Sequence, residues 1–196
     1  MDDSVTDIPS GYIESYTGKL FHWRDPDVDI LDIAHALSNI CRFNGHTSYH
    51  FSIASHSILV SYLCELFHAD PIEGLLHDAS EAYACDIPTP IKLDLRGYKE
   101  AEKIIQTKIT ATLGLPSSLN PKVRQADLLS LYLEAEKLMP SGGKHYMGGR
   151  PEEKIMEAGR TISQRHYPID RYDQEEVEEI FLLRYNTLKY NRQQVA

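Results

Sequence analysis

Apolar residues recur every three or four positions through most of this chain, which is the spacing of one face of an α-helix. The exception is the segment 12–21, where the pattern predicts a short hairpin or extended cover with its turn at Thr17 and Gly18. Mainly helical periodicity is typical of an all-α fold. We therefore expect a helical bundle with a short N-terminal extended or hairpin segment.

Start and stop signals bound the helices in the first half of the chain. A core helix is expected to begin at Asp29, its N-cap, and to end near 42–45. A second helix is expected through about 50–68. A third begins at Asp70, which is followed by a proline and then an acid at the third helical position, and this region ends at the proline turn 88–90.

The second half contains two helices with clear boundaries. They are expected over 98–113, stopped by Gly114, and over 121–138, opened by Asn120. The glycine-rich stretch 140–149 is the expected mobile loop.

A last helix completes what we expect to be one domain. Asp173 and Glu176 form a capping box, and the helix should run to about residue 191. No repeat, low-complexity tract or long linker divides the 196 residues, a length at which one domain buries an adequate core.

Composition favours a globular, cytoplasmic protein. The chain has 42% hydrophobic and 25% charged residues, and its mean hydropathy is -0.38. It contains no apolar run long enough to span a bilayer, and its first residues lack the features of a signal peptide. Three cysteines without CxxC spacing are expected to be reduced, small core residues. The expected location is the cytoplasm, or the host cytoplasm if the chain is phage-encoded.

Charge narrows the range of ligands. A net charge of -9 and a pI near 5.4 disfavour binding along a nucleic acid polymer. A small phosphate compound remains a suitable ligand, provided that a metal ion or a few cations offset the local repulsion.

The informative polar residues lie on three predicted helices. His56 is in the second helix, and His77 and Asp78 are adjacent in the third. Asp127 is in the helix expected over 121–138. Imidazole nitrogens and carboxylate oxygens suit a borderline divalent ion and would leave positions for water and a phosphate oxygen. Glu81 is expected one turn after the His-Asp pair on the same side of the helix, so its carboxylate could reach a metal-bound water.

Each of these residues also has a structural interpretation. A lone His on an apolar face, such as His56, is more often a hydrogen-bonded core residue, and Asp127 alone would be a partly buried helix acid. Four unpaired polar groups in one core would each cost roughly 1 to 3 kcal/mol, however. Together they therefore favour a metal site.

These motifs closely resemble those of the HD-domain phosphohydrolases, whose signature is a first His, an HD doublet and a distant Asp. Here they are His56 within SIASHS, His77 and Asp78 within LLHDASEAYACDIPTPIK, and Asp127 within VRQADLL. The doublet with its following acid and proline turn looks like the branch containing bacterial 5'-deoxynucleotidases. The stretches DIAHALSNICRFNGH and YTGKLF look like small phage and bacterial HD proteins that include phage dATP triphosphohydrolases. The resemblance covers about residues 12–138 and implies one HD phosphohydrolase domain over 1–196.

The resemblance also implies a role for each matching residue. The metal ligands would be His56, His77, Asp78 and Asp127, with a divalent ion such as Co, Mn, Zn or Mg. The catalytic residues would be Glu81, which orients or deprotonates the attacking water, and the ligand Asp78. The residues assigned to the substrate are Arg42, Phe43, Asn44, His46, Asp86 and Lys92. Among them Lys92 would hold phosphate, and Arg42 would contact the nucleotide unless it is a solvated cation at a helix end.

The implied function is a metal-dependent deoxynucleotide phosphohydrolase. The first hypothesis is a dATP triphosphohydrolase, which releases deoxyadenosine and triphosphate, and the alternative within enzymes is a 5'-deoxynucleotidase acting on monophosphates. An alternative from another class is a nucleotide-binding regulatory module, although such a module has no need of Glu81. The expected partners are a small-molecule deoxynucleotide and further copies of the chain in a homo-oligomer, without a nucleic acid polymer or a membrane.

Overall fold

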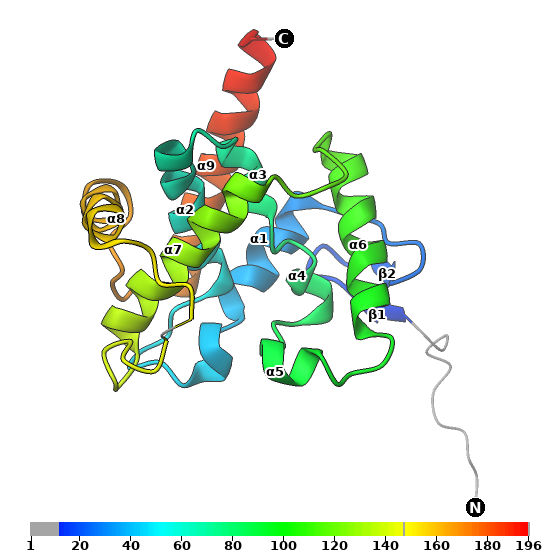
Figure 1. Cartoon of the computed structure of the whole chain (residues 1–196). Coiled ribbons are helices and arrows are strands. Elements are labelled where there is room, and N and C mark those ends of the chain that lie inside the picture. The colour runs from blue at the N-terminus through cyan, green and yellow to red at the C-terminus, as the bar shows by residue number, and fades with distance from the viewer. Residues whose placement is uncertain (1–11, 147, 196) are drawn as a thin grey trace, which may run out of the picture.

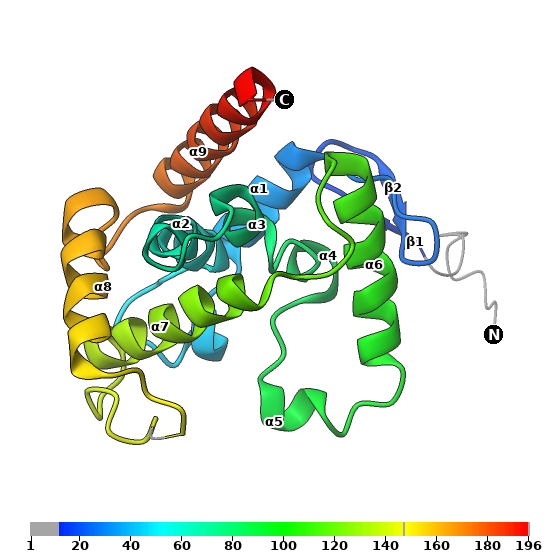
Figure 2. The same ribbon diagram turned by 45° about the horizontal axis from the view of Figure 1, so that its top comes forward.

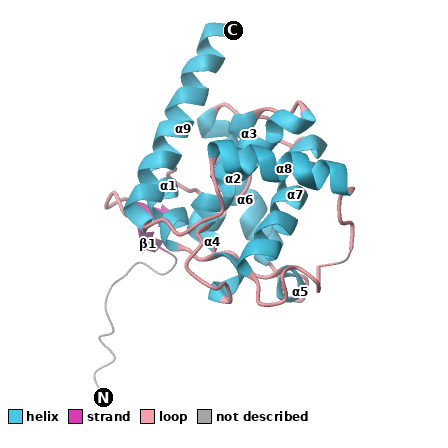
Figure 3. Ribbon diagram, turned by 90° about the vertical axis from the view of Figure 1, so that its left-hand side faces the viewer, coloured by secondary structure: helices cyan, strands magenta, loops and turns pink. Residues whose placement is uncertain are grey.

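The computed structural model describes residues 12–146 and 148–195. In that part of the chain the elements are β1 (Tyr12–Glu14), β2 (Leu20–His22), α1 (Ile30–Asn39), η1 (Arg42–Gly45), α2 (Ile53–Leu63), η2 (Cys64–Phe67), α3 (Pro71–Leu76), α4 (Glu81–Ala84), α5 (Thr89–Lys92), α6 (Tyr98–Leu113), α7 (Pro121–Leu138), α8 (Glu153–His166) and α9 (Gln174–Val195). The labels η1 and η2 denote 3-10 helices. Helices dominate and the two strands are short, so the predicted all-α fold is confirmed (Figure 3).

Helix α2 is the centre of the bundle. Ten of its eleven residues are buried, Tyr62 being half-buried, so it is surrounded by protein on all sides. Helices α1, α3, α7, α8 and α9 pack against it, while α6 and α8 lie on opposite flanks of the molecule (Figures 1 and 2). Any polar side chain that α2 carries therefore lies in the core and needs a partner there.

The N-terminal segment forms the expected hairpin and covers one end of the bundle. Strands β1 and β2 pair antiparallel, and Gly18 takes a φ of 78° in the connecting turn. Thr17 donates its backbone N–H to Asp32 Oδ1 at 2.7 Å, which ties the turn to α1. On β2, the buried Phe21 stacks on Tyr83 with 4.1 Å between ring centroids.

Several predicted helix boundaries are confirmed because local caps set them. The side chains of Asp29, Asp70 and Asn120 each accept a hydrogen bond from the backbone N–H two residues later. Gly114 ends α6 in the left-handed region with a φ of 68°. Asp173 accepts from the Glu176 N–H just before α9, which runs to Val195, beyond the expected end.

Two predicted helices are too long. The first core helix ends at Asn39, not near 42–45, because Cys41 forms an isolated antiparallel bridge with Ser52. The second spans Ile53–Leu63 and continues only as the 3-10 helix η2, not as one helix over 50–68. Ser52 caps α2 by accepting from the Ser55 N–H at 3.0 Å, which fixes this later start.

Helix α8 is an element that the sequence analysis did not predict. It packs on α7 through the buried Met156 and Gly159, and a Cβ at Gly159 would lie only 2.9 Å from a Leu129 methyl group. The expected loop before it is present as turns, except that Met147 lies outside the described residues.

The three cysteines differ in exposure. Cys64 is buried and Cys41 is half-buried, but Cys85 is exposed with a φ of 66°, so its assignment to the core is wrong. Across the described residues, we find no helix that combines the length and the apolar character needed to cross a membrane.

Candidate metal centre and active site

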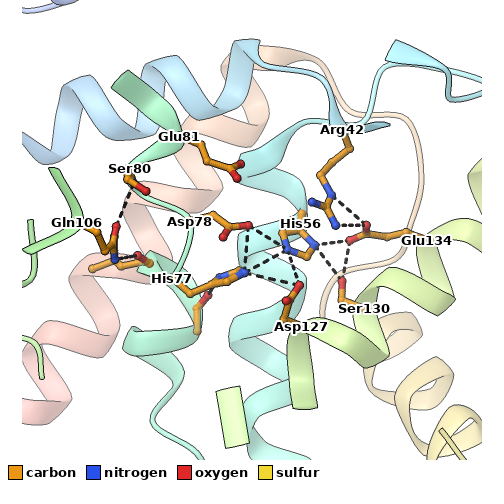
Figure 4. Close-up of polar contacts among 12 residues, drawn as sticks. Arg42, His56, His77, Asp78, Ser80, Glu81, Gln106, Asp127, Ser130 and Glu134 are labelled. Carbon is orange, nitrogen blue, oxygen red and sulfur yellow. Dashed lines mark hydrogen bonds and ion pairs between the residues drawn. The ribbon is translucent and has the colours of Figure 1, made fainter. Parts of the chain in front are cut away.

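His56 enters the site from the buried helix α2. Its position in the second turn follows from the Ser52 cap, and its side chain is fully buried. An imidazole there must satisfy both ring nitrogens inside the protein. Its Nε2 faces a group of side chains from two other segments, and its Nδ1 faces α7 (Figure 4).

His77 and Asp78 lie on a turn, so their expected place inside a continuous third helix is wrong. Helix α3 ends at Leu76, His77 is its C-cap, and a new helix, α4, begins only at Glu81. Consecutive side chains on an α-helix diverge by about 100°. The break allows the two neighbours to converge, with His77 Nε2 at 3.1 Å from Asp78 Oδ2.

Two hydrogen-bonding partners hold this turn in shape. His77 Nδ1 lies 2.8 Å from the carbonyl oxygen of Gly74, which can only accept a hydrogen bond. The proton is therefore on Nδ1, and Nε2 can face other partners. The Gln106 side chain on α6 donates to the Leu76 carbonyl at 3.2 Å and accepts from the Ser80 N–H at 3.1 Å (Figure 4). Gln106 thus clamps both ends of the turn.

Asp127 completes the cluster from α7, the helix in which it was expected. Its Oδ1 lies 3.2 Å from His56 Nε2 and 3.7 Å from His77 Nε2, and the two imidazole Nε2 atoms are 3.3 Å apart. Asp78 Oδ2 is 3.5 Å from His56 Nε2. The structure therefore brings all four predicted ligands together (Figure 4).

These separations fit a divalent metal ion. Ligand atoms about 2.1 Å from one ion lie roughly 3.0 Å apart at right angles and roughly 3.4 Å apart at tetrahedral angles. His56, His77 and Asp127 can present ligand atoms that all lie within 4.8 Å of one another. Nitrogen and oxygen donors of this kind suit Mn, Co, Zn or Mg. Asp127 is 41% exposed while His56 is fully buried, so the cluster has one side open to small molecules.

Charges inside the cluster are mutually stabilising. Burial opposes protonation of His77, but Asp78 and Asp127 outweigh burial and raise its pKa to about 10. For Asp78, burial favours the neutral acid, but His77 and His56 hold the pKa well below its ordinary value. Without a metal ion, the imidazoles and carboxylates of the cluster therefore stabilise each other's charged forms.

Glu134 and Ser130 are functional candidates that the sequence analysis missed. Glu134 is fully buried, and its Oε1 lies 2.7 Å from His56 Nδ1. Ser130 donates its hydroxyl to the same oxygen at 2.7 Å. Asp127, Ser130 and Glu134 are spaced i, i+3 and i+7, which places them on one stripe of α7, and that spacing is the signal that could have found them.

Glu81 lies beside the cluster at the start of α4. It is 6% exposed, and its Oε2 has no hydrogen-bond partner among the described residues. Burial, with the nearby Asp78 and Asp86 carboxylates, raises the Glu81 pKa to about 9, although Arg42 and Lys92 oppose the shift. A buried carboxyl oxygen left without a partner is costly in a purely structural role and is common where a proton is handled.

The residues assigned to the substrate differ in how the structure holds them. Lys92 donates to Glu102 at 2.8 Å and lies 3.8 Å from Glu81 Oε1, so it is near the site but already paired. Asp86 is half-buried, and Asn44 and His46 are exposed on the η1 turn.

Phe43 is presented by an unusual backbone. Both Phe43 and Asn44 have positive φ values, 53° and 51°, which side-chain-bearing residues seldom adopt. The Phe43 ring meets Tyr146 edge to face at 6.0 Å, and the Arg42 guanidinium lies 5.3 Å from its centroid. Such backbone strain is concentrated at functional sites, so the turn is a candidate contact for a ligand.

Fold and site together define an all-α protein with a partly buried His/His/Asp cluster suited to a divalent metal. No family model matches the chain. It is 42% identical to the uncharacterized protein YfdR of Escherichia coli (strain K12) over 130 residues, which are 65% of this chain and 72% of that protein. The chain belongs to the same family as YfdR.

Two other relatives extend the comparison. The chain is 36% identical to an uncharacterized protein of Rhodobacter capsulatus over 140 residues, covering 62% of this chain and 70% of that protein. It is also 23% identical to a 5'-deoxynucleotidase of Pasteurella multocida (strain Pm70) over 150 residues, covering 59% of this chain and 77% of that enzyme. The last similarity is distant.

Proposed function

We propose that this protein is a metal-dependent phosphohydrolase of the HD type that acts on a deoxynucleotide. The observation that carries the proposal is the convergence of His56, His77, Asp78 and Asp127, which come from two helices and a turn, at separations that suit one divalent ion. The distant similarity to a 5'-deoxynucleotidase supports the same reaction class.

The cluster and its neighbours have complementary tasks in this reaction. A divalent ion supplies Lewis acidity toward water and toward a phosphoryl oxygen. Glu81 would accept the proton of the attacking water at its unpaired Oε2. The positive charge of an ion beside Asp78 opposes the repulsion that raises the Glu81 pKa, so metal loading favours the ionised, basic form. Lys92 and Arg42 supply cations for phosphate oxygens near this acid.

Within this class, two different bonds of the nucleotide are candidates for hydrolysis. The motif DIAHALSNICRFNGH favours dATP triphosphohydrolase activity, which releases deoxyadenosine and triphosphate. A groove of about 300 Å³ beside His77 and Asp78 adds room for a longer phosphate chain, and its lining carries both cations and acids, namely Lys99, Lys103, Glu73 and Glu102. The similarity to the Pasteurella enzyme favours the second candidate, a 5'-deoxynucleotidase acting on monophosphates.

A metal-supplemented substrate panel tests the proposal and separates the candidates. The protein, loaded in turn with Mn, Co, Zn or Mg, is incubated with dNTPs, dNMPs and NTPs, and the products are resolved by anion-exchange chromatography. Triphosphate from dATP supports the first candidate, and orthophosphate from dAMP supports the second. Nucleotide binding without turnover under every metal would contradict the proposal and favour a regulatory module.

A further inference from the structure

We propose that Glu134 is a positioning residue whose single carboxylate orients both His56, the proposed metal ligand, and the cation Arg42. The inference rests on the proposed function in one respect, the assignment of His56 as a metal ligand. It adds a residue that none of the predicted site motifs contains, and it predicts that metal binding and nucleotide binding share one support.

Glu134 places a carboxyl group inside the core of the bundle. It lies on α7, fully buried, one helical turn after Ser130 and two turns after Asp127. An ionised carboxylate in the core is retained only when hydrogen bonds and opposite charges compensate its lost hydration. His56 Nδ1 and the Arg42 guanidinium lie against the Glu134 carboxylate, and the Ser130 hydroxyl donates to it, so this compensation is present.

The two carboxylate oxygens have separate partners. Oε1 lies 2.7 Å from His56 Nδ1 and accepts from the Ser130 hydroxyl at 2.7 Å. Oε2 accepts a hydrogen bond from Arg42 Nε at 3.2 Å and forms an ion pair with Arg42 Nη2 at 3.2 Å (Figure 4). Glu134 therefore connects the imidazole of α2 to the guanidinium of η1.

The contact with His56 has a direct consequence for metal binding. A carboxylate at Nδ1 requires the proton to be on Nδ1, so the Nε2 lone pair points toward His77, Asp78 and Asp127. Carboxylates that accept from a ligating imidazole fix its ring orientation and increase its basicity, and their loss costs about 10- to 100-fold in metal affinity. This size of effect is what we expect for Glu134.

The contact with Arg42 extends the same support to the substrate side. Two guanidinium nitrogens are used on Glu134 Oε2, whereas the third, Nη1, has no hydrogen-bond partner among the described residues and is the one left for a ligand. Arg42 is 13% exposed, so it has little freedom to find another orientation. A change at Glu134 should therefore weaken metal binding and nucleotide binding together.

Glu134→Gln is the sharpest substitution because it preserves shape and removes one acceptor. A carboxylate accepts from both His56 and Arg42, whereas an amide has a single acceptor oxygen and must turn its N–H groups toward one of the two donors. The matched control is Glu136→Gln on the same helix, because Glu136 pairs instead with Arg150 and Arg160 away from the cluster. Ser130→Ala is a milder second variant that leaves the carboxylate in place.

The readout is binding of Co²⁺ or Mn²⁺ alone, measured by titration calorimetry on folded protein, followed by KM and kcat for the best nucleotide of the panel. We expect Glu134→Gln to weaken metal binding by about 10- to 100-fold and to raise KM. Ser130→Ala should weaken metal binding by about fivefold. Glu136→Gln should stay within about twofold of the wild type. If Glu134→Gln does not fold, the Ser130→Ala result decides.

The possible failures can be told apart. Wild-type protein that binds neither ion overturns the metal assignment and this inference with it. Wild-type protein that binds metal, together with a folded Glu134→Gln that binds it equally well, overturns this inference alone, since a purely structural ion pair would change only the melting temperature. If Ser130→Ala binds metal as tightly as the wild type, that result also contradicts the inference.

Discussion

The cluster around His56 and the turn around Phe43 differ in how the fold supports them. His56 and Glu134 are fully buried and joined by a short hydrogen bond, and the neighbouring turn at His77 is clamped by Gln106. Phe43, by contrast, sits on a strained 3-10 turn and contacts Tyr146 only edge to face. The rigid region suits chemistry that needs fixed geometry, whereas the loosely packed region suits contacts that vary with the ligand.

The largest expected effect comes from removing a ligand of the rigid region. His77→Ala or Asp78→Ala should lose metal and activity together, to the background of the assay, because each removes a proposed ligand of the ion. Metal content by mass spectrometry and hydrolysis of the best substrate are the measurements. Asp94→Ala, an exposed acid beyond α5, is the control. Turnover retained in a folded, metal-free variant would refute the site.

The next effect separates catalysis from metal binding within the same region. Glu81→Ala should keep its metal but lose about 10²-fold or more in kcat, as expected for a positioned proton acceptor. Rate measurements at saturating metal, with metal content determined on the same samples, provide the check. A parallel loss of metal would mean that Glu81 is a ligand.

A smaller effect concerns pH and the ion pairs of the metal-free cluster. The His77 pKa is raised from 6.5 to about 10, so its contribution to stability is present below pH 6.5 and is lost as the pH rises through about 10. A bound ion replaces these protons, and apparent metal affinity should increase up to about tenfold per pH unit for each proton displaced. Melting temperatures with and without Mn²⁺, taken from about pH 6 to pH 9.5, measure this. If the increase in melting temperature caused by Mn²⁺ does not grow with pH, the prediction is wrong.

The smallest effect concerns selectivity and belongs to the loosely packed region. If the Phe43 ring lies against C2' of the sugar, a 2'-hydroxyl would be buried unpaired, and deoxynucleotides should be preferred by about tenfold or more. Phe43→Ala should narrow that ratio without changing metal content. Paired kcat/KM values for dATP and ATP are the measurement. Equal wild-type values for the two nucleotides would remove the role assigned to Phe43.

The structure also changes how Arg42 can be tested. If Arg42 binds phosphate, Arg42→Ala should weaken the binding of ribonucleotides and deoxyribonucleotides alike. Because Arg42 is paired with the fully buried Glu134, that substitution would also leave an anion without its partner in the core. A loss of binding in Arg42→Ala therefore has to be compared with its loss of stability.

What the sequence could predict depends on the range of the interactions involved. Helices α6 and α7 begin and end at the expected residues because Asn120 and Gly114 act within one turn of the chain. The four candidate ligands could be selected because their residue types and order are distinctive, and the structure places them together. The break before Glu81 was missed because Gln106, about 30 residues away, stabilises the turn at His77.

Two other differences have the same origin. The early end of α1 depends on the bridge between Cys41 and Ser52, and the role of Glu134 depends on a histidine 78 residues earlier in the chain. Contacts between distant segments are not encoded in local periodicity. Helix α8 is a different case, because Ile155, Met156 and Ile162 follow helical spacing on either side of Gly159, so its amphipathic pattern could have been recognised in the sequence.

The wide spacing of the cluster in the chain bears on how the protein folds. His56 meets His77 across 21 residues and Glu134 across 78, while Arg42 meets Glu134 across 92. Closing such loops is entropically costly before most of the core exists, so the ligands are far apart in the unfolded chain. A metal ion should therefore do little to the refolding rate and act mainly by slowing unfolding, as stabilisation formed after the transition state does. Cells could then load or exchange the ion on a protein that has already folded.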